Sequence, residues 1–119
     1  MGSGGKGAEG WLGVDPYADA DIKAPMDKLP FGDDSVDEIR CIHALEHLPR
    51  ARVIPALEEW YRVLKPGRIV SIDVPDLLAC CRLLLDNPEN LYWLLPIYGS
   101  QTREGDYHLN GFTPSSLRA

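Results

Sequence analysis

The chain has 119 residues, of which 45% are hydrophobic and 25% are charged, as expected for one globular domain with a core of its own. Its formal net charge is −6 and its arginines are scattered singly, so we expect no nucleic-acid partner, which would need a basic face. No apolar run approaches the roughly 20 residues that cross a bilayer, and the glycine-rich start lacks the apolar segment of a signal peptide. We therefore expect a cytoplasmic protein with no membrane partner.

The N-terminal third of the chain predicts little regular structure. Residues 1–10 are rich in glycine, and Trp11-Leu12-Gly13-Val14 predicts a short strand that ends at Asp15-Pro16. Residues 16–35 are rich in proline and aspartate, so we expect them to be mostly loop.

The middle of the chain predicts a strand, a helix and a second strand. Val36 to Ile42 is a short, strand-like apolar run, and residues 69–74 form a β-branched run typical of a strand covered on both faces. Between them, apolar side chains recur at helical spacing from residue 50 to 65, and Pro66-Gly67 ends the helix. The positions on this helical face are Val53, Ala56, Leu57, Trp60, Tyr61 and Leu64. A strand–helix–strand unit of this length implies a parallel sheet, so the predicted fold class is α/β.

The last third of the chain predicts short helices around a long loop. Asp76 is placed to cap a helix that runs to about Leu85, and residues 91–97 predict a second helix broken by Pro96. Residues 98–114 have no clear period and predict a loop, and Thr113-Pro114 predicts the start of a last helix.

The cysteines indicate neither a disulfide framework nor a metal site. Cys41, Cys80 and Cys81 are odd in number, and two of them are adjacent, which gives no C-x-x-C spacing. We interpret them as reduced, apolar residues of a cytoplasmic protein.

Residues 27–76 resemble the second half of a class I S-adenosylmethionine-dependent methyltransferase. The resemblance lies in the order of an acidic loop at 29–35, the strand at 36–42, the helix closed by Lys65-Pro66-Gly67 and the strand that follows. It extends over about residues 2–118 and implies a partial Rossmann-like parallel sheet with flanking helices, in a single, partial domain at 1–119. The implied function is methyl transfer from S-adenosyl-L-methionine to a small-molecule or saccharide acceptor. A non-catalytic cofactor-binding or scaffold fragment of the same fold is the alternative.

The start of the chain resembles the family's cofactor-binding pattern, Gly-x-Gly-Gly followed by Gly-Trp-Leu-x-Val-Asp, through Asp15. The resemblance places Asp15 on the ribose, since one carboxylate can accept hydrogen bonds from both hydroxyls. The family's adenine-contacting aspartate is replaced by Pro25, so a backbone contact from Met26 is expected instead. The cofactor-binding residues that it implies are Gly2, Ser3, Gly4, Gly5, Asp15, Met26, Ile42 and His43. A glycine-rich start is equally typical of a flexible tail.

The segment at 98–114 resembles the corresponding part of a subset of uncharacterised methyltransferase-like proteins, with Ile-Tyr-Gly-x-Gln and His-x-x-Gly-Phe-Thr-Pro. The resemblance implies a loop over the cleft whose substrate-side residues are Tyr98, Gln101, Tyr107 and His108. Methyl transfer needs alignment more than strong acid–base groups. If the acceptor must lose a proton, His43 is the expected catalytic base, with His108 as a second choice.

Residues 43–47 also match the zinc-protease motif H-x-x-E-H, with His43 and His47 as ligands and Glu46 as base. Such a motif needs a sustained helix, whereas Pro49 follows two residues later, and no third ligand is expected. A zinc hydrolase therefore remains a second alternative, and no metal is expected.

The resemblance also implies an incomplete sheet, because the family's strand before the glycine loop and its last two strands have no counterpart here. Open strand edges favour association. We therefore expect a homo-oligomer and poor methyl transfer by the chain alone. Direct pairing of residues 11–14 with 36–42 is the alternative way to close the gap.

Overall fold

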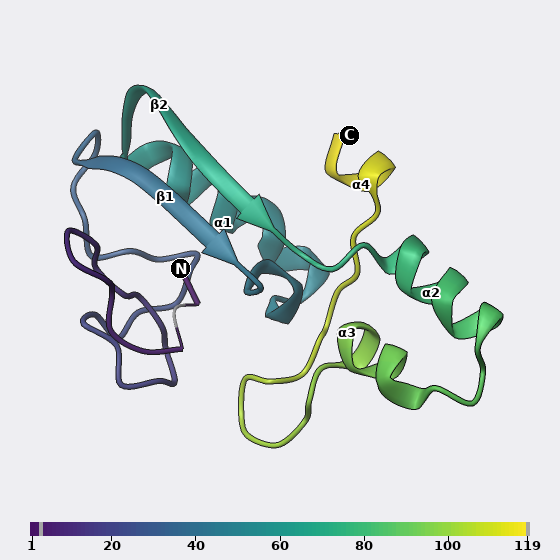
Figure 1. Cartoon of the computed structure of the whole chain (residues 1–119). Coiled ribbons are helices and arrows are strands. Elements are labelled where there is room, and N and C mark those ends of the chain that lie inside the picture. The colour runs from purple at the N-terminus through teal and green to yellow at the C-terminus, as the bar shows by residue number, and fades with distance from the viewer. Residues whose placement is uncertain (3, 119) are drawn as a thin grey trace.

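The computed structural model describes residues 1–2 and 4–118, and its centre is a strand–helix–strand unit (Figure 1). Strands β1 (Val36–Ile42) and β2 (Leu64–Asp73) pair in parallel, with Ile39 opposite Val70 and Cys41 opposite Ile72. Helix α1 (Arg50–Val63) connects them and covers one face of the sheet (Figure 1). The predicted α/β class with a partial parallel sheet is confirmed.

Helix α1 buries a narrow stripe against this sheet. Its buried residues are Val53, Ala56, Trp60 and Val63. The helical period is confirmed, but the prediction for Tyr61 is wrong, because its side chain is 84% exposed. A sheet with two strands is too narrow to cover the wide apolar face that the sequence offers, so the residue at the margin of the stripe stays in solvent. The predicted helix end is also wrong, because the helix stops at Val63 and Leu64 begins β2, which contains Pro66-Gly67.

The prediction that the second strand is covered on both faces is also wrong. Side chains alternate between the faces of a strand, and Ile69, which points away from α1 with its partner Glu38, is 64% exposed. Helices α2 (Leu77–Asp86) and α3 (Leu95–Tyr98) lie beyond the carboxyl end of β2 and do not cover its outer face (Figure 1). The strand therefore carries apolar side chains on a face that no helix covers.

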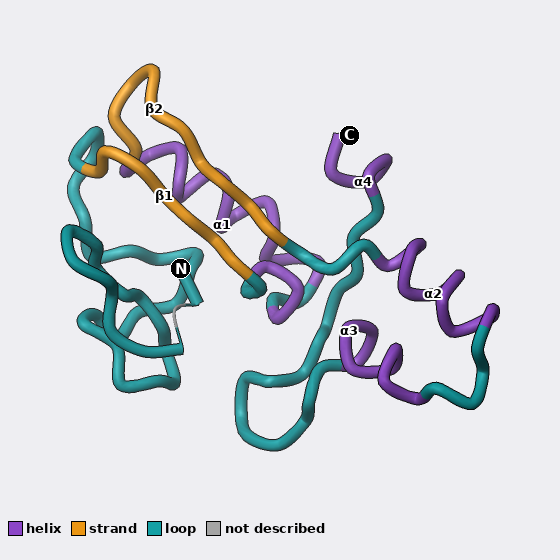
Figure 2. Tube along the Cα trace, in the orientation of Figure 1, coloured by secondary structure: helices purple, strands orange, loops and turns teal. Residues whose placement is uncertain are grey.

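The segment before β1 is loop throughout its described residues (Figure 2). The predicted strand at 11–14 is reduced to one parallel bridge between Val14 and Ile22. The segment at 11–14 does not pair with β1. A groove of about 560 Å³ separates Trp11–Leu12 from the strand residues Val36–Arg40. Across the groove mouth, the guanidinium of Arg40 stacks over the Trp11 ring at 4.3 Å.

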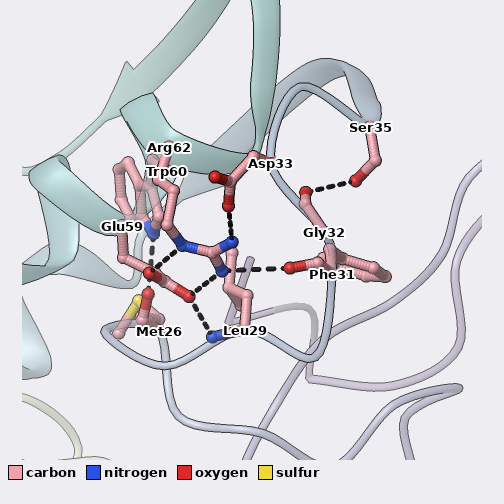
Figure 3. Close-up of polar contacts among 9 residues, drawn as sticks. All are labelled: Met26, Leu29, Phe31, Gly32, Asp33, Ser35, Glu59, Trp60 and Arg62. Atoms are coloured by element: carbon pink, nitrogen blue, oxygen red, sulfur yellow. Dashed lines mark hydrogen bonds and ion pairs between the residues drawn. The ribbon is translucent and has the colours of Figure 1, made fainter.

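The acidic loop at 29–35 is held against α1 by charged side chains of the helix (Figure 3). Arg62 forms ion pairs with Asp33 (2.6 Å) and Glu59 (2.7 Å) and donates a hydrogen bond to the Phe31 carbonyl (3.0 Å). Glu59 in turn accepts a hydrogen bond from the Leu29 N–H (2.8 Å). The hydrogen bonds from Arg62, opposed in part by burial, lower the pKa of Glu59 to about 2.

The last third of the chain forms short helices as predicted. Asp76 caps α2 by accepting hydrogen bonds from the N–H groups of Leu78 and Ala79. A 3-10 turn, η2 (Leu91–Leu94), leads into α3, where Pro96 lies in the first turn and does not break the helix. Helix α4 (Pro114–Arg118) begins after Thr113, whose hydroxyl accepts a hydrogen bond from the Ser116 N–H. No helix among residues 1–2 and 4–118 is long and apolar enough to cross a membrane.

The three cysteines are free thiols. Cys41 is fully buried beneath α1, and burial raises the pKa of its thiol to about 11. It is therefore a core residue and not a reactive thiolate.

Candidate functional site

The described part of the glycine-rich start packs against the body of the protein. Gly2 has φ +56°, and a Cβ at this position would overlap the Cβ of Ala44. A Cβ on Gly13 would likewise overlap the carbonyl oxygen of Gly5. Asp21 accepts hydrogen bonds from the N–H groups of Gly7 (2.7 Å) and Gly13 (2.8 Å) and fixes the turn between them. Of the predicted glycine-loop residues, Ser3 lies outside the described residues.

Asp15 organises the backbone around it. Its Oδ1 accepts hydrogen bonds from the N–H groups of Tyr17 (2.8 Å) and Ala18 (2.9 Å), and its Oδ2 accepts one from Gly4 (3.1 Å). Partial burial alone would raise the pKa of Asp15, but these three hydrogen bonds lower it below its usual value. Asp15 is therefore a carboxylate at neutral pH, and among the described residues its Oδ2 accepts the hydrogen bond from Gly4.

A cleft of about 360 Å³ lies between this turn, the end of β1 and the C-terminal loop. Five of the residues predicted for the cofactor line it: Gly2, Gly4, Asp15, Met26 and His43. The rest of its lining comes from Pro16–Ala18, Ala44, His47 and Arg103–Asp106. The volume falls in the usual range of small-molecule sites.

Two other predicted cofactor residues, Gly5 and Ile42, do not line the cleft. Ile42 is 54% exposed, because it points to the opposite side of β1 from the buried Cys41. His43 follows with φ +48°, an uncommon conformation for a residue with a side chain. Its N–H donates a hydrogen bond to the Asp73 carbonyl (2.8 Å), so the turn after β1 is fixed by β2.

A family model described as a methyltransferase domain matches residues 13–72, which are 60 of the 119 residues. The chain belongs to this family. Searches of curated proteins and of solved structures gave no match. Methyltransferase domains of this kind generally use S-adenosylmethionine. The matched range contains Asp15, Met26 and His43, whereas the glycines at 2–5 and the loop after α3 lie outside it.

The shape of the cleft in this methyltransferase domain suits such a cofactor. Gly2 and Gly4 leave its wall without side chains, and Gly4 has open space where a Cβ would stand. Backbone can therefore approach a ligand closely at this wall. Asp15 offers an anionic acceptor beside it, which is the group that a pair of ribose hydroxyls requires.

The four predicted substrate-side residues of the methyltransferase domain do not line the cleft. The loop folds on itself, because the Tyr98 carbonyl accepts hydrogen bonds from the His108 N–H and from the Gln101 side chain. Tyr107 is 48% exposed, and its carbonyl faces His47. Arg103–Asp106 line the cleft instead, as a turn held by the ion pair between Arg103 and Asp106 (3.0 Å).

A second cluster lies next to the cleft, in the 3-10 turn η1 (Leu45–His47). Glu46 is 1% exposed, with Oε1 at 3.6 Å from His43 Nδ1 and at 4.0 Å from His108 Nε2. The rings of His47 and His108 meet edge to face at a centroid distance of 4.8 Å. The helix that the H-x-x-E-H alternative needs is not formed, because His43 precedes the short turn that carries Glu46 and His47. The motif groups Glu46 with His47 but not with His108, which lies beside both in the structure.

Proposed function

We propose that this methyltransferase domain binds S-adenosylmethionine in the cleft and transfers its methyl group to a small-molecule or saccharide acceptor. One observation carries the proposal. Five residues chosen from the sequence alone, and drawn from four separate segments of the chain, line the same cleft. These residues were grouped only because they match the family's cofactor-binding pattern. That they line one cleft supports the proposal that the cleft binds the cofactor.

The chain's own groups have distinct roles in binding. Asp15 Oδ2 accepts hydrogen bonds from the ribose, while Oδ1 stays engaged with the backbone of Tyr17 and Ala18. The glycine wall lets backbone N–H groups face the polar amino-acid end of the cofactor. Met26 lies at the cleft wall and contacts the adenine through its backbone.

The cofactor supplies a methyl group on a sulfonium, which is already activated for displacement by a nucleophile. The protein must therefore align the acceptor and exclude water. His43 projects at the cleft with its side chain 60% exposed, beside the buried carboxylate of Glu46. It takes the proton that an acceptor hydroxyl loses as the new bond forms.

The turn at Arg103–Asp106 and Tyr17 give the acceptor side of the cleft a polar and aromatic lining. Hydroxyl-rich acceptors such as saccharides suit this lining, because carboxylate and guanidinium groups pair with hydroxyls and aromatic faces pack on sugar rings.

Two measurements on the full chain test the proposal. Isothermal titration with S-adenosylmethionine and with S-adenosylhomocysteine should give saturable binding at one site per chain. Transfer of a labelled methyl group to a panel of saccharide and other hydroxyl acceptors should then separate an enzyme from a non-catalytic binding fragment. Absence of binding to both ligands would refute the function, and binding without transfer to any acceptor would leave the cofactor-binding alternative in its place.

A further inference from the structure

The carboxylate of Glu46 has no partner that explains its burial. The side chain is 1% exposed, and neither carboxylate oxygen has a hydrogen-bond partner among the described residues. A buried charge without compensation is strongly unfavourable, so buried carboxylates are normally paired or bound to a metal. The surroundings of Glu46 must therefore supply a cation or a proton.

Two histidines lie beside this carboxylate, and in each of them one ring nitrogen is hydrogen-bonded to a backbone carbonyl. The Nδ1 atom of His47 lies 3.0 Å from the Tyr107 carbonyl oxygen, and the Nδ1 atom of His108 lies 2.8 Å from that of Pro96. A carbonyl oxygen can only accept a hydrogen bond, so each Nδ1 carries the proton. This leaves Nε2 as the nitrogen available to a metal ion, as in a metal-binding histidine whose other nitrogen donates to a carbonyl.

The Nε2 atom of His108 faces the carboxylate of Glu46. His108 Nε2 lies 4.0 Å from Glu46 Oε1, which is too far for a hydrogen bond. One ligand atom from each of Glu46, His47 and His108 lies within 4.8 Å of the other two. A buried carboxylate without a hydrogen-bond partner among the described residues and two histidines at this distance have the composition of a cation site.

We propose that Glu46, His47 and His108 bind a divalent transition-metal ion of the zinc class. Two imidazoles and one carboxylate are a set of zinc ligands that leaves a fourth position open. With bonds of about 2.0–2.2 Å, ligand atoms in a tetrahedral site lie roughly 3.3–3.6 Å apart. Binding therefore draws the three ligand atoms together by about an ångström.

This set differs from the one that the sequence motif offered. Its third ligand follows Glu46 by 62 residues, and His43 is not part of it. The loop that carries His108 is already docked here, because the N–H groups of Leu109 (2.9 Å) and Asn110 (3.1 Å) donate to the Glu46 carbonyl. The ion fastens this loop to η1, beside the cleft that His47 also lines. The inference does not depend on methyl transfer.

Cobalt(II) is the probe, because its visible spectrum reports coordination directly. The chelator-treated 119-residue chain, titrated with Co²⁺, should develop the visible absorption of a four- or five-coordinate ion at one equivalent. Zinc should displace the cobalt and raise the melting temperature, as any ligand of the folded state does. No spectral change up to millimolar Co²⁺, together with no shift in melting temperature with Zn²⁺, would overturn the proposal.

Variants that keep the local hydrogen bonds test the ligands. His47→Asn and His108→Asn retain a donor toward the carbonyls of Tyr107 and Pro96 while removing Nε2, and Glu46→Gln keeps the side-chain shape. Each should weaken Zn²⁺ binding by at least ~100-fold. Loss of a residue that only orients a ligand costs up to about 100-fold, and loss of the ligand itself should cost no less. Circular dichroism of each variant checks that it remains folded.

Two control variants separate this site from others. His43→Asn should keep full Zn²⁺ affinity, and so should the double variant Cys80→Ser with Cys81→Ser, whose sulfur atoms would otherwise give intense near-ultraviolet bands with cobalt. Binding that survives loss of His47 and His108 but not of His43 or the cysteines would assign the ion to those residues and refute the proposed set.

Discussion

The indole N–H of Trp60 donates a hydrogen bond of 2.9 Å to the carbonyl oxygen of Met26 (Figure 3). Trp60 is 1% exposed on the inner face of α1, and Met26 lines the cleft. The hydrogen bond therefore joins the core of the strand–helix–strand unit to the wall of the candidate site. Packing of the helix and geometry of the cleft are coupled through these two residues.

Removal of the Trp60 side chain should strongly destabilise the protein. Trp60→Ala leaves a large cavity and should lower the free energy of unfolding by about 3–5 kcal/mol in urea denaturation. Trp60→Phe fills most of the space but leaves the Met26 carbonyl without its donor, at a cost of about 1–3 kcal/mol. Tyr61→Ala, at an 84% exposed position on the same helix, should change stability by less than about 0.5 kcal/mol. A loss below ~1 kcal/mol for Trp60→Ala would contradict the burial of this face.

Asp15 and Asp21 form a matched pair for testing cofactor binding. Both carboxylates hold backbone N–H groups of the glycine-rich segment, but only Asp15 lines the cleft. Asp15→Asn should weaken binding of S-adenosylmethionine by about 1.5–3 kcal/mol, the contribution of a charge-assisted hydrogen bond. Asp21→Asn should leave the calorimetric affinity within about threefold. Equal losses for the two variants would show that Asp15 acts only through the turn.

The parts of the fold that could be predicted are those fixed by local pattern. The spacing of Val53, Ala56 and Trp60 specifies a helix and its inner face, and Asp76 lies where a helix cap must stand. Asp15 could be assigned to the cleft because the glycine pattern and the apolar segment at residues 11–14, which ends at Asp15, belong to one family arrangement. In each case the residues that decide the outcome lie close together in the sequence.

Other features depend on contacts between distant segments, which spacing does not encode. The exposure of Ile69 follows from what packs over the sheet and not from the strand itself. The substrate-side role expected for Tyr98 and Tyr107 depended on how a 15-residue loop, residues 99–113, folds between α3 and α4. The approach of His108 to Glu46 likewise depends on where that loop docks.

Stability at acidic pH should depend on Glu59. Its pKa in the folded protein is about 2, lowered chiefly by the hydrogen bonds from Arg62, against about 4.3 in an unfolded chain. The unfolded state therefore takes up the proton first as the pH falls. The stabilisation is complete above about pH 4.5 and is lost progressively toward pH 2.

Glu59→Gln should remove much of this pH dependence. Urea denaturation of the variant between pH 6 and pH 2.5 should give a flatter profile than the unmodified chain, with lower stability at pH 6. Glu58→Gln, at an exposed neighbouring position, is the control and should keep the full dependence. An unchanged profile for Glu59→Gln would show that the ion pair with Arg62 does not stabilise the fold.

The sheet should mediate association of two copies of the chain. Among the described residues the sheet has two strands, and β2 leaves Ile69 64% and Ile72 38% exposed beside an outer edge that pairs with no described strand. An exposed apolar strand edge is a template for pairing with another chain, and a second copy presents the same edge in a self-complementary way.

Light scattering after size-exclusion chromatography should therefore give a dimer or larger species at micromolar concentration. Ile69→Lys places a charge at this contact and should raise the dissociation constant at least ~10-fold, equivalent to about 1.4 kcal/mol, whereas Leu85→Lys, at an 80% exposed position on α2, should not. A stable monomer for the unmodified chain would contradict association through β2.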